Sequence, residues 1–158
     1  MIQRPQTLFF LAIITICMML MFSDTVFYTA ENTNTNEKYS VEYDETEILA
    51  TDGNDKAPNT YIMVFIAAIG VLSIIGLFLF KNRKLQTAFT SVNYIFILGL
   101  IIMMYLYSIH MNYFENQPNT SSFSFYAVLP MALLFFNFLA LKGVRKDEKL
   151  VRSMDRLR

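Results

Sequence analysis

Four long stretches of the chain carry almost no charge, and no other feature restricts its fold as strongly. They cover about residues 8–27, 61–80, 89–109 and 123–141. Each stretch approaches the roughly 20 apolar residues that a helix needs to cross the hydrocarbon core of a bilayer. None has a polar face that recurs at helical spacing, as a surface helix of a water-soluble protein would. The sequence therefore predicts an all-α membrane protein, a bundle of four transmembrane helices.

The first stretch has the short basic start of a signal peptide, but no good cleavage site follows it. Cleavage after Ala30 would place the bulky Tyr28 at the minus-three position, where a small residue is needed. Apolar residues also continue at 26–28, beyond Asp24. We therefore expect an uncleaved membrane anchor.

The lysine and arginine residues of the loops predict the orientation of the helices, since cytoplasmic loops are enriched in them. One side would carry Arg4, three basic residues in the loop 81–88 and seven in the tail 142–158. The other side would carry two, Lys38 and Lys56. Both termini are therefore expected in the cytoplasm, with the loops after the first and third helices outside.

The outer loop over residues 28–60 is acidic and has a strand pattern. Nine carboxylates and two lysines fall in it or just before it. This acidity has two open explanations: a solvated loop that stays outside because it lacks positive charge, or a surface for a cation or a basic partner. Tyr39, Val41 and Tyr43 alternate with polar residues, which is typical of a half-buried strand. We predict a small β-hairpin or three-stranded flap in this loop.

Two asparagines lie within the predicted spans, about two turns from the inner surface. They are Asn93 in the third helix and Asn137 in the fourth. Such residues can hydrogen-bond across a bundle, a link worth about 0.6–2 kcal/mol. The alternative is a polar pocket between the third and fourth helices, next to a kink expected at Pro130.

The second stretch has a face of small residues at every third position. They are Ala67, Gly70, Ser73 and Gly76. Small residues let helix backbones approach closely in a membrane. We expect this face to pack against a neighbouring helix.

The tail over residues 142–158 is basic and has an apolar stripe at helical spacing. The stripe consists of Leu150, Val151, Met154 and Leu157. We expect an amphipathic helix that lies on the anionic inner leaflet or docks on a protein partner. We expect no nucleic acid partner, because no aromatic residues are interleaved with the basic ones. The candidate partner or lipid contacts are Arg4, Arg83, Lys84, Arg145, Lys146, Lys149, Arg152 and Arg156.

The residues needed for chemistry are scarce. The chain has one histidine, His110, and one cysteine, Cys17, which cannot make a usual zinc site or a catalytic triad. It has no glycine-rich phosphate loop, no G-x-S-x-G and no H-E-x-x-H. We therefore expect no catalytic residues, no cofactor and no metal, and a protein that is not an enzyme.

Three runs of the chain resemble a known family: the start MIQRPQTLFFLA, the inner loop FKNRKLQ and the end ALKGVRKDEKLVRSMDRLR. It is an uncharacterised family of four-helix membrane proteins, domain of unknown function 4293, found in Bacteroidetes-type bacteria. The resemblance implies a Gram-negative inner membrane and a periplasmic outer loop, and it implies no reaction. Its motif residues would be cytoplasmic and so suggest a cytoplasmic partner: Gln3, Arg4, Gln6, Asn82, Arg83, Lys84, Gln86 and Arg145 to Arg158.

These observations lead to two expectations for the function. The first is a non-catalytic accessory or scaffold subunit of a bacterial inner-membrane protein complex. The alternative is a small lipid-binding or transport protein that uses the polar pocket near Asn93 and Asn137.

Overall fold

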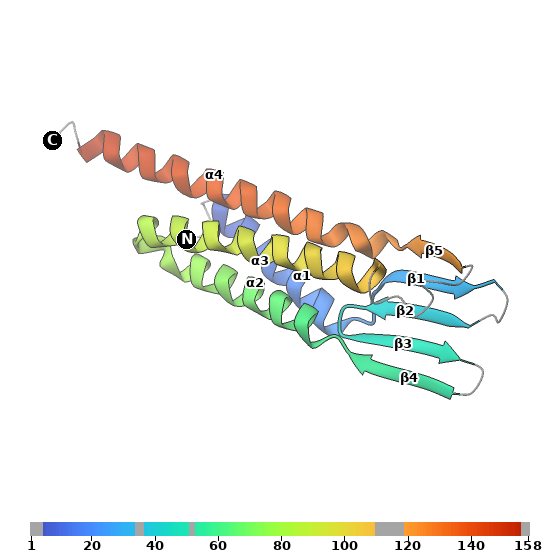
Figure 1. The fold of residues 1–158 in the computed structure, drawn as a ribbon. Helices are drawn as coiled ribbons and strands as arrows, with labels where there is room; N and C mark the ends of the chain where they lie inside the picture. Colours follow the sequence, from blue (N-terminus) through green and yellow to red (C-terminus); the bar gives the residue numbers. More distant parts are fainter. Residues whose placement is uncertain (1–4, 34–36, 51–52, 110–118, 156–158) are drawn as a thin grey trace.

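Four helices and one antiparallel sheet make up the structure, and the sheet lies at one end of the helices (Figure 1). The computed structural model describes residues 5–33, 37–50, 53–109 and 119–155. The helices are α1 (Pro5–Phe22), α2 (Thr60–Phe78), α3 (Arg83–Ile109) and α4 (Leu129–Asp155), with short 3-10 turns η1 (Leu79–Lys81) and η2 (Phe125–Val128). The strands are β1 (Val26–Asn32), β2 (Lys38–Glu42), β3 (Glu45–Ala50), β4 (Gly53–Pro58) and β5 (Asn119–Phe123).

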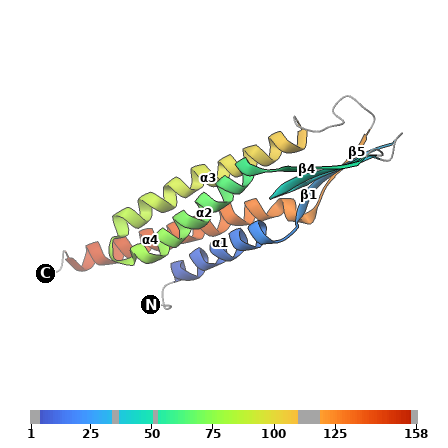
Figure 2. The ribbon, with the colours of Figure 1, turned by 90° about the horizontal axis from the view of Figure 1, so that it is seen from below.

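The helices form a closed bundle in which α1 and α3 each pack against both α2 and α4 (Figures 1 and 2). Three helical stretches are long and apolar enough to cross a membrane: Thr60–Phe78, Arg83–Ile109 and Phe125–Leu150. The apolar part of α1, Gln6–Phe22, is shorter. The first predicted span, 8–27, was too long at its end, because residues 26–28 belong to strand β1.

The small-residue face of α2 packs closely against α1, as predicted. A Cβ atom added at Gly76 would lie 3.0 Å from the ring of Phe10, and one at Gly70 would lie 3.6 Å from the Cβ of Cys17. Ser73, between these glycines on the same face, is fully buried. The packing follows from the absence of large side chains at these positions.

The sheet has five strands in the order β4-β3-β2-β1-β5. The prediction of an all-α protein with a small hairpin or three-stranded flap is therefore wrong. Both outermost strands were missed, because GNDKAP in β4 and NTSSF in β5 are mostly polar or turn-forming residues without an alternating apolar pattern. Strand β5 comes from the other loop and pairs with β1, where Thr29 lies opposite Ser122. Local sequence carries no signal for such a distant pairing.

One face of the sheet continues the core of the bundle. Tyr39, Val41 and Tyr43 are all buried, so the prediction that they share a side is confirmed. The hydroxyl of Tyr39 donates to the carbonyl oxygen of Tyr107 at the end of α3 (3.3 Å). That of Tyr43 donates to the carbonyl oxygen of Tyr126 in η2 (2.8 Å). The tyrosines therefore tie the sheet to the helix ends.

Burial of Tyr39 makes the stability of the fold sensitive to alkaline pH. Desolvation raises the pKa of this phenol from 10.0 to about 12. The stabilisation that the neutral phenol contributes is complete below the unfolded-state pKa and is lost as pH rises from 10 towards 12.

We expect the free energy of unfolding of the wild type to fall by roughly 2 kcal/mol over that pH range because of Tyr39. The free energy of unfolding of Tyr39→Phe should fall by less, as thermal unfolding at each pH would show. Tyr61→Phe, at an exposed tyrosine, is the control. Parallel pH profiles for the wild type and Tyr39→Phe would contradict this assignment.

A buried asparagine joins the sheet to the bundle. Asn59 lies between β4 and α2 and is 1% exposed. Its Oδ1 accepts from the hydroxyl of Thr46 (2.8 Å), and its Nδ2 donates to the carbonyl oxygen of Glu42 (2.7 Å). Its backbone N–H donates to the carbonyl oxygen of Asp44 (2.8 Å). One residue thus ties the β2–β3 hairpin to the start of α2.

Helix α4 is continuous from Leu129 to Asp155 and extends past the ends of the other helices (Figures 1 and 2). The kink expected at Pro130 is wrong, because this proline is the second residue of the helix. Backbone N–H groups in a first turn have no partner within the helix, so proline is tolerated there. The helix predicted for the tail over 142–158 is the last part of α4 as far as Asp155.

Candidate functional site

A layer of buried polar side chains crosses the bundle in the half away from the sheet. Asn93 on α3 donates through Nδ2 to the Oγ of Ser73 on α2 (3.0 Å). Asn137 on α4 donates through Nδ2 to the carbonyl oxygen of Thr90 on α3 (3.1 Å). Both asparagines are at most 1% exposed. The predicted contacts across the bundle are therefore present, and they link α3 to both α2 and α4.

Two glutamines extend this layer. The Nε2 of Gln86 donates to the carbonyl oxygen of Gly76 on α2 (2.8 Å), and Thr90 Oγ1 donates to the carbonyl oxygen of Gln86 (2.7 Å). Gln6 on α1 is buried against Gly143 of α4, where an added Cβ would lie 3.2 Å from the Cβ of Gln6. Gln6 and Gln86 were named as motif residues on the cytoplasmic side that suggest a partner there, but both side chains are buried inside the bundle.

Helical spacing on α3 contains the signal for this layer. The buried residues of α3 are Gln86, Thr90, Asn93, Ile97, Leu100, Met104 and Ser108, a single stripe at steps of three and four. Gln86 and Thr90 were missed as members of the layer, although they share the stripe of Asn93.

Asn82, another motif residue, lies just before α3, and its side chain accepts from the backbone N–H of Leu85 (3.4 Å). Its role in the structure is to cap a helix.

Oxygen atoms without partners distinguish the layer chemically. Among the described residues, five buried side-chain oxygens have no hydrogen-bond partner: Gln6 Oε1, Gln86 Oε1, Thr87 Oγ1, Asn93 Oδ1 and Asn137 Oδ1. Four of the five are amide oxygens, which only accept hydrogen bonds. A buried acceptor without a partner costs about 1–3 kcal/mol. The layer therefore contains hydrogen-bond acceptors that are not used within the described part of the protein.

The layer separates two hydrophobic clusters. The smaller one, at the end away from the sheet, is formed by Phe10, Ala140 and Val144. The larger one includes Ile13, Leu100 and many other residues, and it continues into the buried face of the sheet. In the part of the chain that the structure describes, no three histidine, cysteine or acidic residues are grouped to hold a metal ion.

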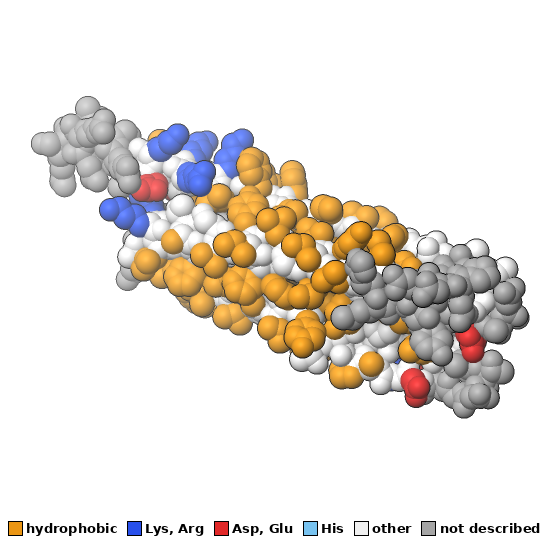
Figure 3. Space-filling model, viewed as in Figure 1, with side chains coloured by type: hydrophobic (Ala, Val, Ile, Leu, Met, Phe, Trp, Pro, Cys, Tyr) orange, Lys and Arg blue, Asp and Glu red, His pale blue; other side chains and the backbone are white. Residues whose placement is uncertain are grey.

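The predicted cations divide into three sets. Arg145, Lys146 and Lys149 are exposed on α4, and they are joined by Lys142, which the prediction omitted. Arg83 and Lys84 begin α3. Arg4 and Arg156, and the side chain of Arg152, lie outside the described residues. Lysine and arginine side chains gather at this end of the molecule, beyond the apolar belt (Figure 3); we call it the basic end.

A groove of about 450 Å³ runs along α4 at the basic end. Two apolar residues and four basic residues line it: Phe138, Leu141, Lys142, Arg145, Lys146 and Lys149. Apolar and cationic side chains therefore succeed one another along one side of the helix. This arrangement suits an amphiphile with an anionic head group.

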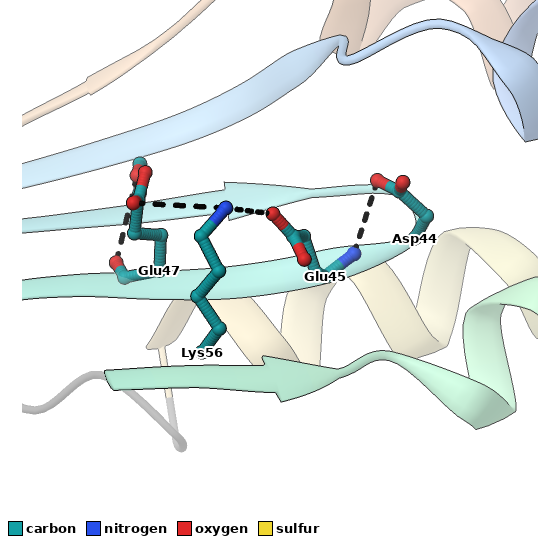
Figure 4. Close-up of polar contacts among 5 residues, drawn as sticks. Asp44, Glu45, Glu47 and Lys56 are labelled. Carbon is teal, nitrogen blue, oxygen red and sulfur yellow. Dashed lines mark hydrogen bonds and ion pairs between the residues drawn. The ribbon is translucent and has the colours of Figure 1, made fainter. Parts of the chain in front are cut away.

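The outward face of the sheet is polar and contains a second groove. Its volume is about 530 Å³, and its lining includes Thr29, Lys38, Ser40, Glu42, Glu47 and Ser122. Lys56 forms ion pairs with Glu45 and with Glu47 (3.7 Å for the latter), and Asp44 Oδ1 accepts from the backbone N–H of Glu45 (3.0 Å) (Figure 4). Burial and the neighbouring carboxylates, Asp44 first among them, raise the pKa of Glu42. The acidic character predicted for this segment is thus concentrated on the sheet.

The fold and these sites define a class: a helical bundle with membrane-crossing length and apolarity, extended by an antiparallel sheet. The chain matches the family described as Domain of unknown function (DUF4293) over residues 2–157, and it belongs to that family. The resemblance seen in the sequence is therefore confirmed. No curated protein matches the chain.

Proposed function

We propose that this protein is a non-catalytic accessory or scaffold subunit of a bacterial inner-membrane protein complex. The observation that carries the proposal is the joint between sheet and bundle. Tyr39, Tyr43 and Asn59 fix the sheet to the helix ends through buried and part-buried hydrogen bonds, while the opposite face of the sheet stays polar and grooved. A surface held rigidly loses little further entropy when a partner binds it.

We also infer the orientation and the setting. The basic end would face the cytoplasm and the acidic sheet the periplasm, because positively charged segments stay on the cytoplasmic side. The gathering of blue side chains at the end away from the sheet, where red is also present, supports this (Figure 3). The membrane would be the inner membrane of a Gram-negative bacterium of the Bacteroidetes type, as the motif runs at both ends of the chain suggest.

Site-specific photocrosslinking in native membranes tests the proposal. We expect a photoreactive residue at Thr29 or Ser122, on the outward face of the sheet, to give one protein adduct of constant mass at native expression level. The control is Leu98, an exposed apolar residue of α3, which should give lipid adducts only. If Thr29 and Ser122 yield no protein adduct, the scaffold proposal fails.

A second function is favoured by the unpartnered oxygens: binding of a lipid headgroup or small solute with hydrogen-bond donors, between α3 and α4. Phosphatidylethanolamine carries an ammonium group with three N–H donors, and phosphatidylcholine has none. We expect phosphatidylethanolamine to raise the thermal stability of the wild type more than phosphatidylcholine does. Asn137→Leu should abolish the difference, because it removes one of the buried oxygens.

The control for this experiment is Asn82→Leu, which alters an exposed asparagine outside the layer. It should preserve the difference between the two lipids. Equal stability of the wild type in both lipids would rule out this second function.

A further inference from the structure

The groove on α4 changes character along its length. Phe138 and Leu141 line one end of it, and Lys142, Arg145, Lys146 and Lys149 line the rest. Relative to Phe138 the other positions are i+3, i+4, i+7, i+8 and i+11, so they share one side of the helix. Phe138 is 53% exposed, on a stretch of α4 apolar enough to cross a membrane. The apolar end of the groove therefore faces acyl chains, and the cationic end lies where the apolar belt stops (Figure 3).

The charged residues that line this groove are all basic. None of its four cations forms an ion pair with a described residue, whereas Lys56 on the sheet forms two. The acidic residues of the same helical segment, Asp147 and Glu148, do not line the groove. Four cations within about two turns thus present donors and charge to an external anion.

We infer that this groove binds an anionic phospholipid, with the phosphate held by Lys142, Arg145, Lys146 and Lys149 and an acyl chain lying along Phe138. An acidic protein segment could satisfy the cations, but it could not use the exposed phenyl ring at membrane depth. A phospholipid fits both parts, because its charge and its hydrocarbon are joined in the same order. This inference depends on the helices crossing a membrane and is independent of the scaffold proposal.

Native mass spectrometry of full-length protein released from nanodiscs tests the inference. The nanodiscs contain an equimolar mixture of phosphatidylglycerol and phosphatidylcholine. We expect the wild type to retain phosphatidylglycerol preferentially. Each basic residue near an anionic lipid surface contributes about fivefold in affinity. The double variant Arg145→Gln/Lys146→Gln should therefore retain phosphatidylglycerol about 30-fold less selectively.

The matched control is Arg83→Gln/Lys84→Gln, which also removes one arginine and one lysine at the basic end but leaves the groove intact. It should retain phosphatidylglycerol as the wild type does. Equal losses in the two double variants would show a diffuse charge effect and overturn the inference. Equal binding of the two lipids by the wild type would also overturn the inference. This outcome is measured on the wild type alone and does not depend on whether a variant folds.

A competition experiment distinguishes the lipid from other anions. Glycerol phosphate, which has the head-group charge and no acyl chain, should fail to displace the retained phosphatidylglycerol. If it displaces the lipid, or if an acidic peptide does so equally well, the groove is an anion site without lipid specificity and the inference is wrong.

Discussion

Asn59→Ala is expected to lower the free energy of unfolding by about 2–4 kcal/mol. The side chain of Asn59 is buried and satisfies both the hydroxyl of Thr46 and the carbonyl oxygen of Glu42. Alanine would leave both groups without their partner, in a site that is buried at Thr46 and part-buried at Glu42. The loss is large because each buried group then carries its own desolvation cost.

Thermal unfolding of the purified protein in detergent, combined with limited proteolysis, measures this effect. The sheet should become sensitive to protease before the helices do, because Asn59 connects them. Asn82→Ala is the control, since Asn82 is exposed and makes one long capping bond. A loss below about 1 kcal/mol, the ordinary value of one hydrogen bond, would show that Asn59 does not hold the joint. The rigid attachment of the sheet to the helix ends, on which the scaffold proposal depends, would then lack its main support.

Gly76→Leu is expected to disrupt the contact between α1 and α2 and to lower stability by about 3 kcal/mol. A Cβ at this position would already lie 3.0 Å from the ring of Phe10, which is fully buried. A leucine adds three further carbon atoms in the same direction. The displacement would also strain the hydrogen bond from Gln86 to the carbonyl oxygen of Gly76. Overpacking and a perturbed polar layer therefore act together.

Gly70→Ala provides the comparison on the same helix. Its Cβ would lie 3.6 Å from the Cβ of Cys17, an ordinary van der Waals contact. Alanine also restricts the unfolded chain more than glycine does, so we expect stability to be unchanged or up to about 1 kcal/mol higher. Denaturant titration of both variants in the same detergent checks the pair. If Gly76→Leu proves as stable as Gly70→Ala, the close approach of α1 and α2 is not required.

The candidate sites were predictable in part. Asn93 and Asn137 stood out because polar residues are rare in apolar stretches, and both take part in the layer. Gln6 and Gln86 were noted only as motif residues of the family resemblance, on the cytoplasmic side, and not as members of a buried layer. Their burial depends on where α1 meets α4 and where α3 meets α2. The groove on α4 was half predicted, because three of its four cations were identified and its apolar end was not.

By itself the sequence determined the helices, their sequential order and the strand character around Tyr39, since hydrophobic length and period are local properties of the chain. Tertiary structure alone decided the five-stranded sheet, because the polar residues of β4 and β5 adopt strands only through pairing with β3 and β1. It also decided that Pro130 lies in the first turn of a helix, because strand β5 and the turn η2 take up the chain ahead of α4. Pairing energy between distant segments thus overrode the local preferences of these residues.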